Sequence, residues 1–274
     1  MDLPEPIRHG TALHGEMHSM EKLRMLGGSF SHAKSSTLFK ESENIQYAHD
    51  ADESISIDHF EPATYAWLCE SRAICPLPYK QALDNYETYK TVYRYIFTHD
   101  YSLIEKDSDL FKYVPADWCW VDEPTLQNKS KLLSFITSNK RMCPGHNYRL
   151  SWKERLEPFC DVYGRGFNEI ACKEDGLADY MFSVAIENAK YDAYFTEKIL
   201  DCFAMGCVPI YHGTEKVCDF FNSDGIIFLS DDFDPRSLNK ELYLSKEKAI
   251  QENLEIVKSI RTSEDYMFKN YFNN

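Results

Sequence analysis

The sequence predicts an α/β protein built from two Rossmann-like lobes. The strongest sign is the segment Met181–Gly213, which contains a buried strand, a polar turn, a helix and a second strand in the order of a βαβ module. Short apolar runs in both halves of the chain end in polar residues, as parallel strands do at a ligand-binding edge. With 274 residues, 43% of them hydrophobic, the chain can bury one large core or two modest ones.

The first half of the chain contains two predicted strands. Residues 1–60 are polar, weakly periodic and without a recognised motif. Tyr65–Cys69 and Val92–Phe97 are predicted as short buried strands, because each is apolar and is followed directly by polar residues. The aromatic-rich segment Phe111–Val121 comes next, and the polar stretch Asp122–Ser130 is predicted as the linker between the lobes.

The second half repeats the alternation of strand and helix. Leu132–Thr137 is predicted as a strand, Ser138–Tyr148 as a loop because it contains Pro and Gly, and Leu150–Phe159 as a helix. Gly225–Leu229 is a further predicted strand, and the chain is helix-prone from Pro235 onward. We therefore expect three parts, a first lobe, a second lobe and C-terminal helices that pack back across both, over residues 1–130, 131–240 and 241–274.

The βαβ module presents polar groups at the end of its first strand. Met181–Ile186 is apolar and ends abruptly at Glu187 and Asn188, which therefore emerge at the carboxyl end of the strand. Thr196 is a suitable N-cap for the helix, and Gly206 is a suitable stop. The first helical turn then carries Glu197 and Lys198, beside a helix N-terminus that is suited to binding anions.

Charge and cysteine content limit the classes of partner. The net charge of −14 argues against nucleic acid or an anionic membrane, because both require a basic surface. Any anionic substrate must be held by a local cluster of cations. The nine cysteines are odd in number and scattered, which favours a reducing cytoplasmic compartment. We expect no signal peptide and no transmembrane segment, because the sequence shows neither an N-terminal apolar region nor a run of 18 apolar residues.

The run from Ile186 to Gly213, IENAKYDAYFTEKILDCFAMGCVPIYHG, resembles the donor-binding signature of the family 10 glycosyltransferases, the α1,3/4-fucosyltransferases. That pattern has Glu-Asn after a strand, Tyr-x-Thr-Glu-Lys opening a helix, and then Val-Pro-Ile/Val and an aromatic-x-Gly. The chain is most similar to the soluble bacterial or viral members. The resemblance implies a GT-B-like fold, whose two Rossmann-like lobes face a cleft, with the acceptor side on the first lobe and the donor site on the second.

The implied reaction is inverting, metal-independent transfer of fucose from GDP-fucose to a carbohydrate hydroxyl, with no cofactor. Such a reaction needs a base for the acceptor hydroxyl and positive charge for the departing diphosphate. The sequence WLCES resembles the strand and Glu-Ser that carry the family's proposed base, which makes Glu70 the catalytic candidate. Arg72 stands where the family more often has Pro. The simpler alternative is that Glu70 is a solvated carboxylate at a strand end.

The resemblance also assigns the donor site. The pattern of Ser-Asn, a loop and the sequence RLSWKERL resembles a family motif, and its Arg149 falls on the family's diphosphate-binding Arg. Lys198 supplies the second cation. Glu197 matches the residue that accepts hydrogen bonds from the ribose hydroxyls, although a first-turn carboxylate also stabilises a helix dipole without a ligand. Asn188 and Tyr194 match positions around the nucleoside. Glu187 is either a ligand contact or a group that orients the neighbouring backbone.

Two triplets have the DxD form of metal-dependent glycosyltransferases, Asp50-Ala51-Asp52 and Asp107-Ser108-Asp109. Neither directly follows a convincing buried strand, and such triplets arise by chance among 44 acidic residues, so we expect no metal site. Two rival functions remain: a glycosyltransferase of the same fold that uses another nucleotide sugar, and a non-catalytic protein that binds nucleotide or carbohydrate.

Overall fold

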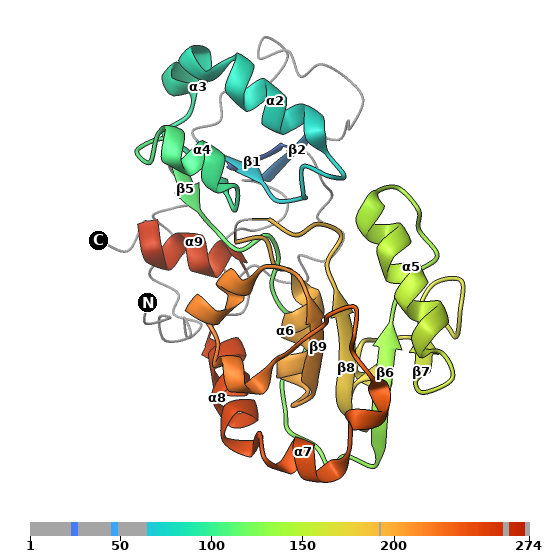
Figure 1. Ribbon diagram of the computed structural model, residues 1–274. Coiled ribbons are helices and arrows are strands. Elements are labelled where there is room, and N and C mark those ends of the chain that lie inside the picture. Colours follow the sequence, from blue (N-terminus) through green and yellow to red (C-terminus); the bar gives the residue numbers. More distant parts are fainter. Residues whose placement is uncertain (1–22, 27–44, 49–64, 192, 260–262, 272–274) are drawn as a thin grey trace. The chain divides into compact units, whose positions relative to one another are not determined.

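The computed structural model describes residues 23–26, 45–48, 65–191, 193–259 and 263–271 (Figure 1). These residues form two compact units, each built on one sheet. The C-terminal unit contains Trp118–Tyr191 and Phe195–Ser259. The N-terminal unit contains the described residues up to Asp117, residues 193–194 and the helix over 263–271.

The N-terminal unit has a parallel sheet in the order β2-β1-β3-β4-β5. Its strands are β1 (Leu23–Leu26), β2 (Ile45–Ala48), β3 (Tyr65–Leu68), β4 (Tyr95–Thr98) and β5 (Phe111–Tyr113). Its helices are α2 (Pro76–Asp84), α3 (Tyr86–Val92), α4 (Tyr101–Lys106) and α9 (Ser263–Tyr271). The buried side chains of this core come from three strands and from α2, α3 and α4, and include Ala66, Leu68, Tyr79, Tyr89, Ile96, Leu103 and Phe111.

The C-terminal unit has a second parallel sheet, in the order β10-β9-β8-β6-β7. Its strands are β6 (Lys131–Ile136), β7 (Asp161–Tyr163), β8 (Tyr180–Ile186), β9 (Val208–His212) and β10 (Ile227–Phe228). Its α-helices are α5 (Pro144–Leu156), α6 (Glu197–Ala204), α7 (Lys240–Leu244) and α8 (Glu247–Ser259). Four short 3-10 turns join them, η2 (Glu174–Gly176), η3 (Glu215–Asp219), η4 (Ser223–Gly225) and η5 (Pro235–Ser237).

The two sheets share one topology. Counted along the chain within each unit, both follow the strand order 2-1-3-4-5, which is a common order of doubly wound sheets. The predicted α/β class with two Rossmann-like lobes is therefore confirmed. In such sheets ligands bind outside the carboxyl ends of the strands, at the point where the strand order reverses. That point lies between β1 and β3 in one unit and between β6 and β8 in the other.

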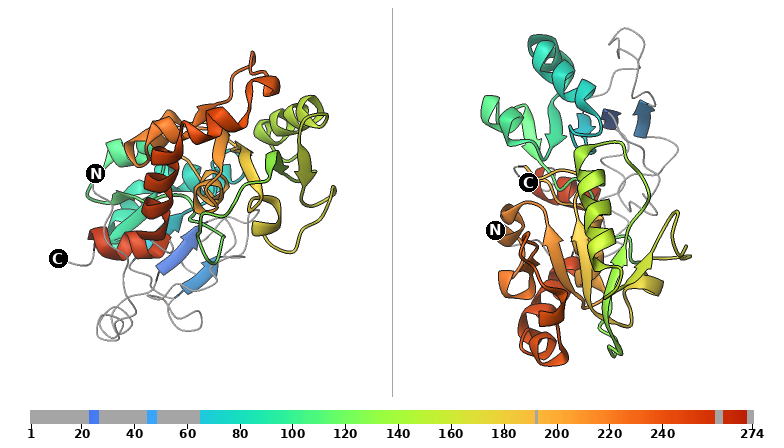
Figure 2. Two further views of the ribbon diagram at one scale, coloured as in Figure 1. Left: turned by 90° about the horizontal axis from the view of Figure 1, so that it is seen from below. Right: turned by 45° about the vertical axis from the view of Figure 1, so that its right-hand side comes forward.

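The central strand β8 is buried along its whole length, because helices cover both faces of its sheet. Phe182 and Val184 share a buried cluster with Trp152 of α5. The alternate side chains Ser183 and Ala185 point to the opposite face of the sheet. Figures 1 and 2 show α5 and α6 on opposite sides of these strands.

The predicted βαβ module is confirmed as β8, α6 and β9. Thr196 caps α6, and its hydroxyl accepts a hydrogen bond from the Lys198 N–H. Gly206 follows the helix with a φ of 66°, in the left-handed region that favours glycine. Within the described residues, no helix is both long enough and apolar enough to cross a bilayer.

The chain passes from one unit to the other between Asp117 and Trp118, earlier than the boundary predicted after residue 130. The predicted linker Asp122–Ser130 is instead part of the C-terminal unit, because both this segment and the residues just before it are bound there. The Trp118 indole N–H donates to the Val257 carbonyl at 3.4 Å. The Thr125 N–H donates to the Ala204 carbonyl at 2.8 Å. Of the C-terminal helices, α7 and α8 belong to the C-terminal unit and α9 to the N-terminal unit.

Helix α5 begins at Pro144, within the segment predicted as a loop. Proline suits the first helical position, because its fixed φ is helical and its missing N–H would have no partner there. Gly145 follows because no side chain fits: a Cβ at this position would lie 2.0 Å from the Asn188 carbonyl oxygen. A smaller correction concerns Val92, which ends α3 and does not begin β4.

We therefore expect Gly145→Ala to destabilise the protein. The Asn188 backbone must move away from the new methyl group, and such overpacking costs about 1–3 kcal/mol. The melting temperature should fall by about 2–4 °C for each kcal/mol lost. Ser151→Ala, at an exposed position of the same helix, is the control and should change it little. Equal melting temperatures for wild type and Gly145→Ala would contradict the close approach.

Candidate functional site

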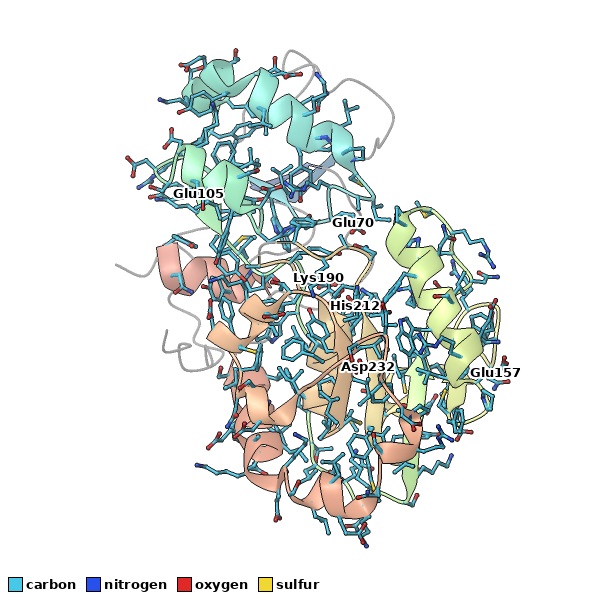
Figure 3. The ribbon with its side chains drawn as sticks, viewed as in Figure 1. Glu70, Glu105, Glu157, Lys190, His212 and Asp232 are labelled. Carbon is cyan, nitrogen blue, oxygen red and sulfur yellow. The ribbon has the colours of Figure 1, made fainter. Side chains whose placement is uncertain are left out.

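In the C-terminal unit, polar groups gather at the carboxyl ends of β6, β8 and β9. Ser138 follows β6, Glu187 follows β8, and His212 is the last residue of β9. The Glu187 N–H donates to the His212 carbonyl at 2.9 Å, which continues the pairing of β8 and β9 beyond their ends. Figure 3 labels His212 there, together with Lys190 in the loop after β8. This edge lies at the reversal point of the sheet, where the topology predicts a ligand.

Glu187 organises the start of α6. Its side chain is fully buried and accepts hydrogen bonds from the Thr196 N–H at 2.9 Å and from the Thr196 hydroxyl at 2.8 Å. Burial raises the pKa of Glu187, while Lys198, whose Nζ lies 3.4 Å from its Oε2, acts in the opposite direction. Glu187 therefore orients the backbone before α6, as one of its two predicted roles requires. A ligand contact by Glu187 stays a prediction.

Lys198 lies at the centre of the polar groups before α6. Its Nζ is 2.9 Å from the Thr196 hydroxyl oxygen, 3.3 Å from Glu197 Oε1 and 3.4 Å from Glu187 Oε2. The side chain remains 21% exposed, so it is the one member of this group with marked access to solvent. A cation held in this way beside a capped helix N-terminus is suited to an anionic ligand.

Glu197 is ionised at neutral pH. Burial acts to raise its pKa, but the neighbouring cations Lys198 and Lys173 lower the pKa of Glu197 to about 2. Its side chain is only 9% exposed. The structure thus holds a charged carboxylate acceptor beside the ammonium of Lys198.

Lys173 also belongs to this cluster, although the sequence offered no sign of it. It lies in the loop before β8, with its Nζ 3.0 Å from Asp201 Oδ2 and 3.9 Å from Glu197 Oε1. The Asp201 carboxylate also accepts the Trp120 N–H at 2.7 Å. These partners come from separate parts of the chain, so no local motif could indicate their contact.

A small cavity lies beside the cluster. Its volume is about 20 Å³, enough for one water molecule. Lys173, Lys198 and Asp201 line its polar side, and Ile136 and Ala185 are among its apolar walls.

Arg149 is buried in the second turn of α5, and not at the helix start as predicted, because α5 begins earlier. Its guanidinium donates to the Ser138 hydroxyl at 3.5 Å. The buried His146 lies one turn before it and accepts the Met142 N–H on Nδ1 at 3.1 Å. Burial and the charges of Arg149, Lys140 and Lys198 lower the pKa of His146 to about 4. Arg149 and Lys198 therefore act on one neutral histidine, which no sequence motif indicated.

Asn188 joins this edge to α5. It is 8% exposed, and its backbone carbonyl accepts a contact from the Cys143 thiol at 3.5 Å. The same carbonyl is the group that excludes a side chain at Gly145. The structure thus brings Arg149, Glu187, Asn188, Glu197 and Lys198 to one edge of the C-terminal sheet.

The other two predicted residues belong to the N-terminal unit. Glu70 lies just after β3 and is half-buried (Figure 3). Its Oε1 accepts the Ser71 N–H at 2.7 Å and the Tyr194 hydroxyl at 3.4 Å. Tyr194, predicted at the nucleoside, is therefore found with the candidate base.

The backbone around Glu70 is held by buried groups. The Tyr79 hydroxyl donates to the Glu70 carbonyl at 2.6 Å and lies 3.1 Å from His99 Nε2. His99 is fully buried, and this burial lowers its pKa to about 4. Arg72, in place of the family's Pro, pairs with the buried carboxylate of Asp100 at 2.8 Å. These contacts fix the direction in which Glu70 leaves the sheet.

The DxD triplet at 107–109 is not part of either site. Asp107 accepts the Tyr86 hydroxyl at 2.6 Å and the N–H groups of Asp109 and Leu110, so its carboxylate has a structural role. The triplet at 50–52 lies outside the described residues. In the part of the chain that the structure describes, no three His, Cys, Asp or Glu side chains are grouped as metal ligands.

Comparison with known proteins identifies the C-terminal unit. Residues 126–254 match the family model described as glycosyltransferase family 10 (fucosyltransferase) C-term. Alpha-(1,3)-fucosyltransferase B of Drosophila melanogaster is 38% identical over 79 residues, which are 25% of this chain and 18% of that protein. Alpha-(1,3)-fucosyltransferase FucT of Helicobacter pylori is 28% identical over 136 residues, 47% of this chain and 27% of that protein.

A crystal structure of an α1,3-fucosyltransferase is similar with a TM-score of 0.46 and 14% sequence identity, and the match covers 93% of this chain and 90% of that chain. The chain spans only a minor part of either curated relative. The match to the family model includes Arg149, Glu187, Asn188, Glu197 and Lys198. It begins at residue 126 and therefore does not include Glu70. Over residues 126–254, the chain is thus similar to glycosyltransferase family 10, the fucosyltransferase family.

Proposed function

We propose that this chain moves fucose from GDP-fucose to a hydroxyl group of a carbohydrate acceptor, with inversion at the transferred carbon and without a metal or other cofactor. The observation that carries the proposal is the position of Lys198 at the capped N-terminus of α6, inside the matched domain. The charges of Lys198 and Arg149 both lower the pKa of His146. The names of the relatives support fucose as the transferred group.

The donor diphosphate is assigned to Arg149, Lys198 and the N-terminus of α6. A guanidinium can donate to two phosphate oxygens at once, an ammonium adds a point charge, and the helix terminus adds partial positive charge. Together these groups stabilise the negative charge that develops on the leaving diphosphate, which is the task that a divalent cation performs in other glycosyltransferases. Glu187 supports this site by holding Thr196.

Binding of the nucleoside is assigned to three further residues. The ionised carboxylate of Glu197 accepts hydrogen bonds from the ribose hydroxyls, as the family resemblance implies. Asn188 contacts the nucleoside, and the family resemblance implies the same role for Tyr194. The C-terminal unit is thus the donor lobe, and the N-terminal unit the acceptor lobe.

Glu70 is the proposed base. The acceptor oxygen forms the new bond to the sugar carbon while the bond to the diphosphate oxygen breaks, and the hydroxyl proton passes to the Glu70 carboxylate. A single displacement of this kind inverts the configuration. Ser71 and Tyr194 both donate to Oε1, so the carboxylate keeps acceptor sites that can take the proton of the acceptor hydroxyl.

We also propose a reducing, cytoplasmic location. All nine cysteines lie within the described residues, and none of them forms a disulfide. That composition suits a compartment in which thiols stay reduced.

Replacing Lys198 with Ala should weaken GDP binding roughly thirtyfold, because a partly buried charge-assisted contact is worth about 2 kcal/mol or more. Titration calorimetry measures the affinity. Lys216→Ala is the matched control, since Lys216 is exposed in the same unit and forms a surface ion pair with Asp219. GDP affinity that is equal in Lys198→Ala and Lys216→Ala would remove Lys198 from the diphosphate site.

Transfer should continue in excess EDTA, because cationic side chains and a helix terminus are assigned the role of a metal. The measurement is the rate of transfer from GDP-fucose to Gal/GlcNAc-type oligosaccharides, with and without chelator. If chelation abolished transfer and Mn²⁺ restored it, the metal-independent mechanism would be wrong.

Glu70→Gln should lower single-turnover transfer by about 10²- to 10⁴-fold, because the amide cannot take the acceptor proton. GDP affinity and melting temperature should stay close to wild type. Glu105→Gln, at an exposed glutamate of α4 in the same unit, is the control and should transfer normally (Figure 3). Near-normal transfer by Glu70→Gln would exclude Glu70 as the base, and transfer only from a different nucleotide sugar would refute the donor.

A further inference from the structure

Lys173 is a half-buried cation next to the proposed ribose acceptor, and no motif accounts for it. Its side chain is 19% exposed, and its Nζ lies 3.0 Å from Asp201 Oδ2. The ring of Trp120 lies under the same ammonium, with its centroid 4.8 Å away. Removing an ammonium from water is costly unless it is paired, so these contacts fix where the charge sits.

Asp201 anchors Lys173 independently of the helix start. Asp201 lies one turn after Glu197 on α6, is 2% exposed, and accepts the Trp120 N–H at 2.7 Å on its other oxygen. The second carboxylate near the Lys173 ammonium is that of Glu197, whose Oε1 lies 3.9 Å from Lys173 Nζ. Within a poorly solvated site, a charge at this distance still orients a carboxylate strongly.

Lys198 alone cannot hold Glu197 once a donor is bound. Its ammonium is shared between Glu187, Thr196 and Glu197, and the proposed diphosphate would add a fourth partner. Lys173 differs in its partners, because its ammonium pairs with Asp201 and lies over the Trp120 ring.

We propose that Lys173 is a positioning residue for the ribose site, holding the Glu197 carboxylate in place as a hydrogen-bond acceptor while Lys198 engages the diphosphate. This inference rests on the proposed function of the same site. The direction of the electrostatics agrees, since the carboxylates of Asp201 and Glu197 raise the pKa of Lys173 in spite of its burial, and Lys173 in turn lowers the pKa of Glu197.

The test compares GDP with 2′-deoxy-GDP and 3′-deoxy-GDP by titration calorimetry. In the wild type, at least one deoxy analogue should bind roughly tenfold more weakly, since a hydrogen bond to a charged carboxylate is lost. In Lys173→Gln, GDP should bind roughly tenfold more weakly while that analogue stays within about twofold of its wild-type affinity. The ratio of the two affinities therefore collapses, which a general loss of structure would not produce.

Lys131→Gln is the matched control, because Lys131 also lies over an aromatic ring, that of Tyr180, and beside a carboxylate, that of Asp161, in the same unit. It should keep the wild-type ratio. Should Lys173→Gln fail to fold, Asp201→Asn carries the same expectation, since the amide keeps the shape and an acceptor for Trp120 while releasing Lys173.

Two results would overturn the inference alone: equal weakening of GDP and the analogue in Lys173→Gln, or no weakening of either. A wild type that binds GDP without distinguishing the deoxy analogues would overturn the role of Glu197 and this inference with it. A wild type that binds no nucleoside diphosphate would refute the proposed function itself.

Discussion

The candidate donor site depends on one buried carboxylate. Glu187 follows the central strand of its sheet and accepts two hydrogen bonds from Thr196, so the strand end and the helix start are tied together. A carboxylate in this position is costly to bury, and the cost is offset only by complete pairing with those donors and with Lys198. The direction of α6, and hence the positions of Glu197 and Lys198, follows from this link.

The sequence predicted most where the signals were local. The module of β8, α6 and β9 is contiguous, with an apolar strand, a capping threonine and a terminating glycine, and each signal held. Pro144 and Gly145 misled the prediction, because both residues also mark loops, and only the contact with Asn188 shows why they begin a helix. A short segment such as β7, of three residues, carried too little pattern to be recognised.

Contacts between distant parts of the chain were beyond sequence reasoning. The pairing of Lys173 with Asp201, and the neutral His146 among three cations, depend on how helices and loops pack against the sheet. The same holds for Trp118, whose aromatic surroundings in the sequence did not reveal that it packs with the C-terminal unit. Residue identity indicated the candidate chemistry, and tertiary packing decided which side chains share a site.

The contact between Gly145 and the Asn188 carbonyl bears on the entropy of ligand binding. Backbone lies directly against backbone there, so the start of α5 and the loop after β8 leave no room for independent rotation. Arg149, one turn farther along α5, is therefore held relative to Glu187 and Asn188 by rigid main chain and not by adjustable side-chain contacts. A ligand that reaches this edge meets charges whose ordering was completed when the protein folded, and little conformational freedom remains to be lost on binding.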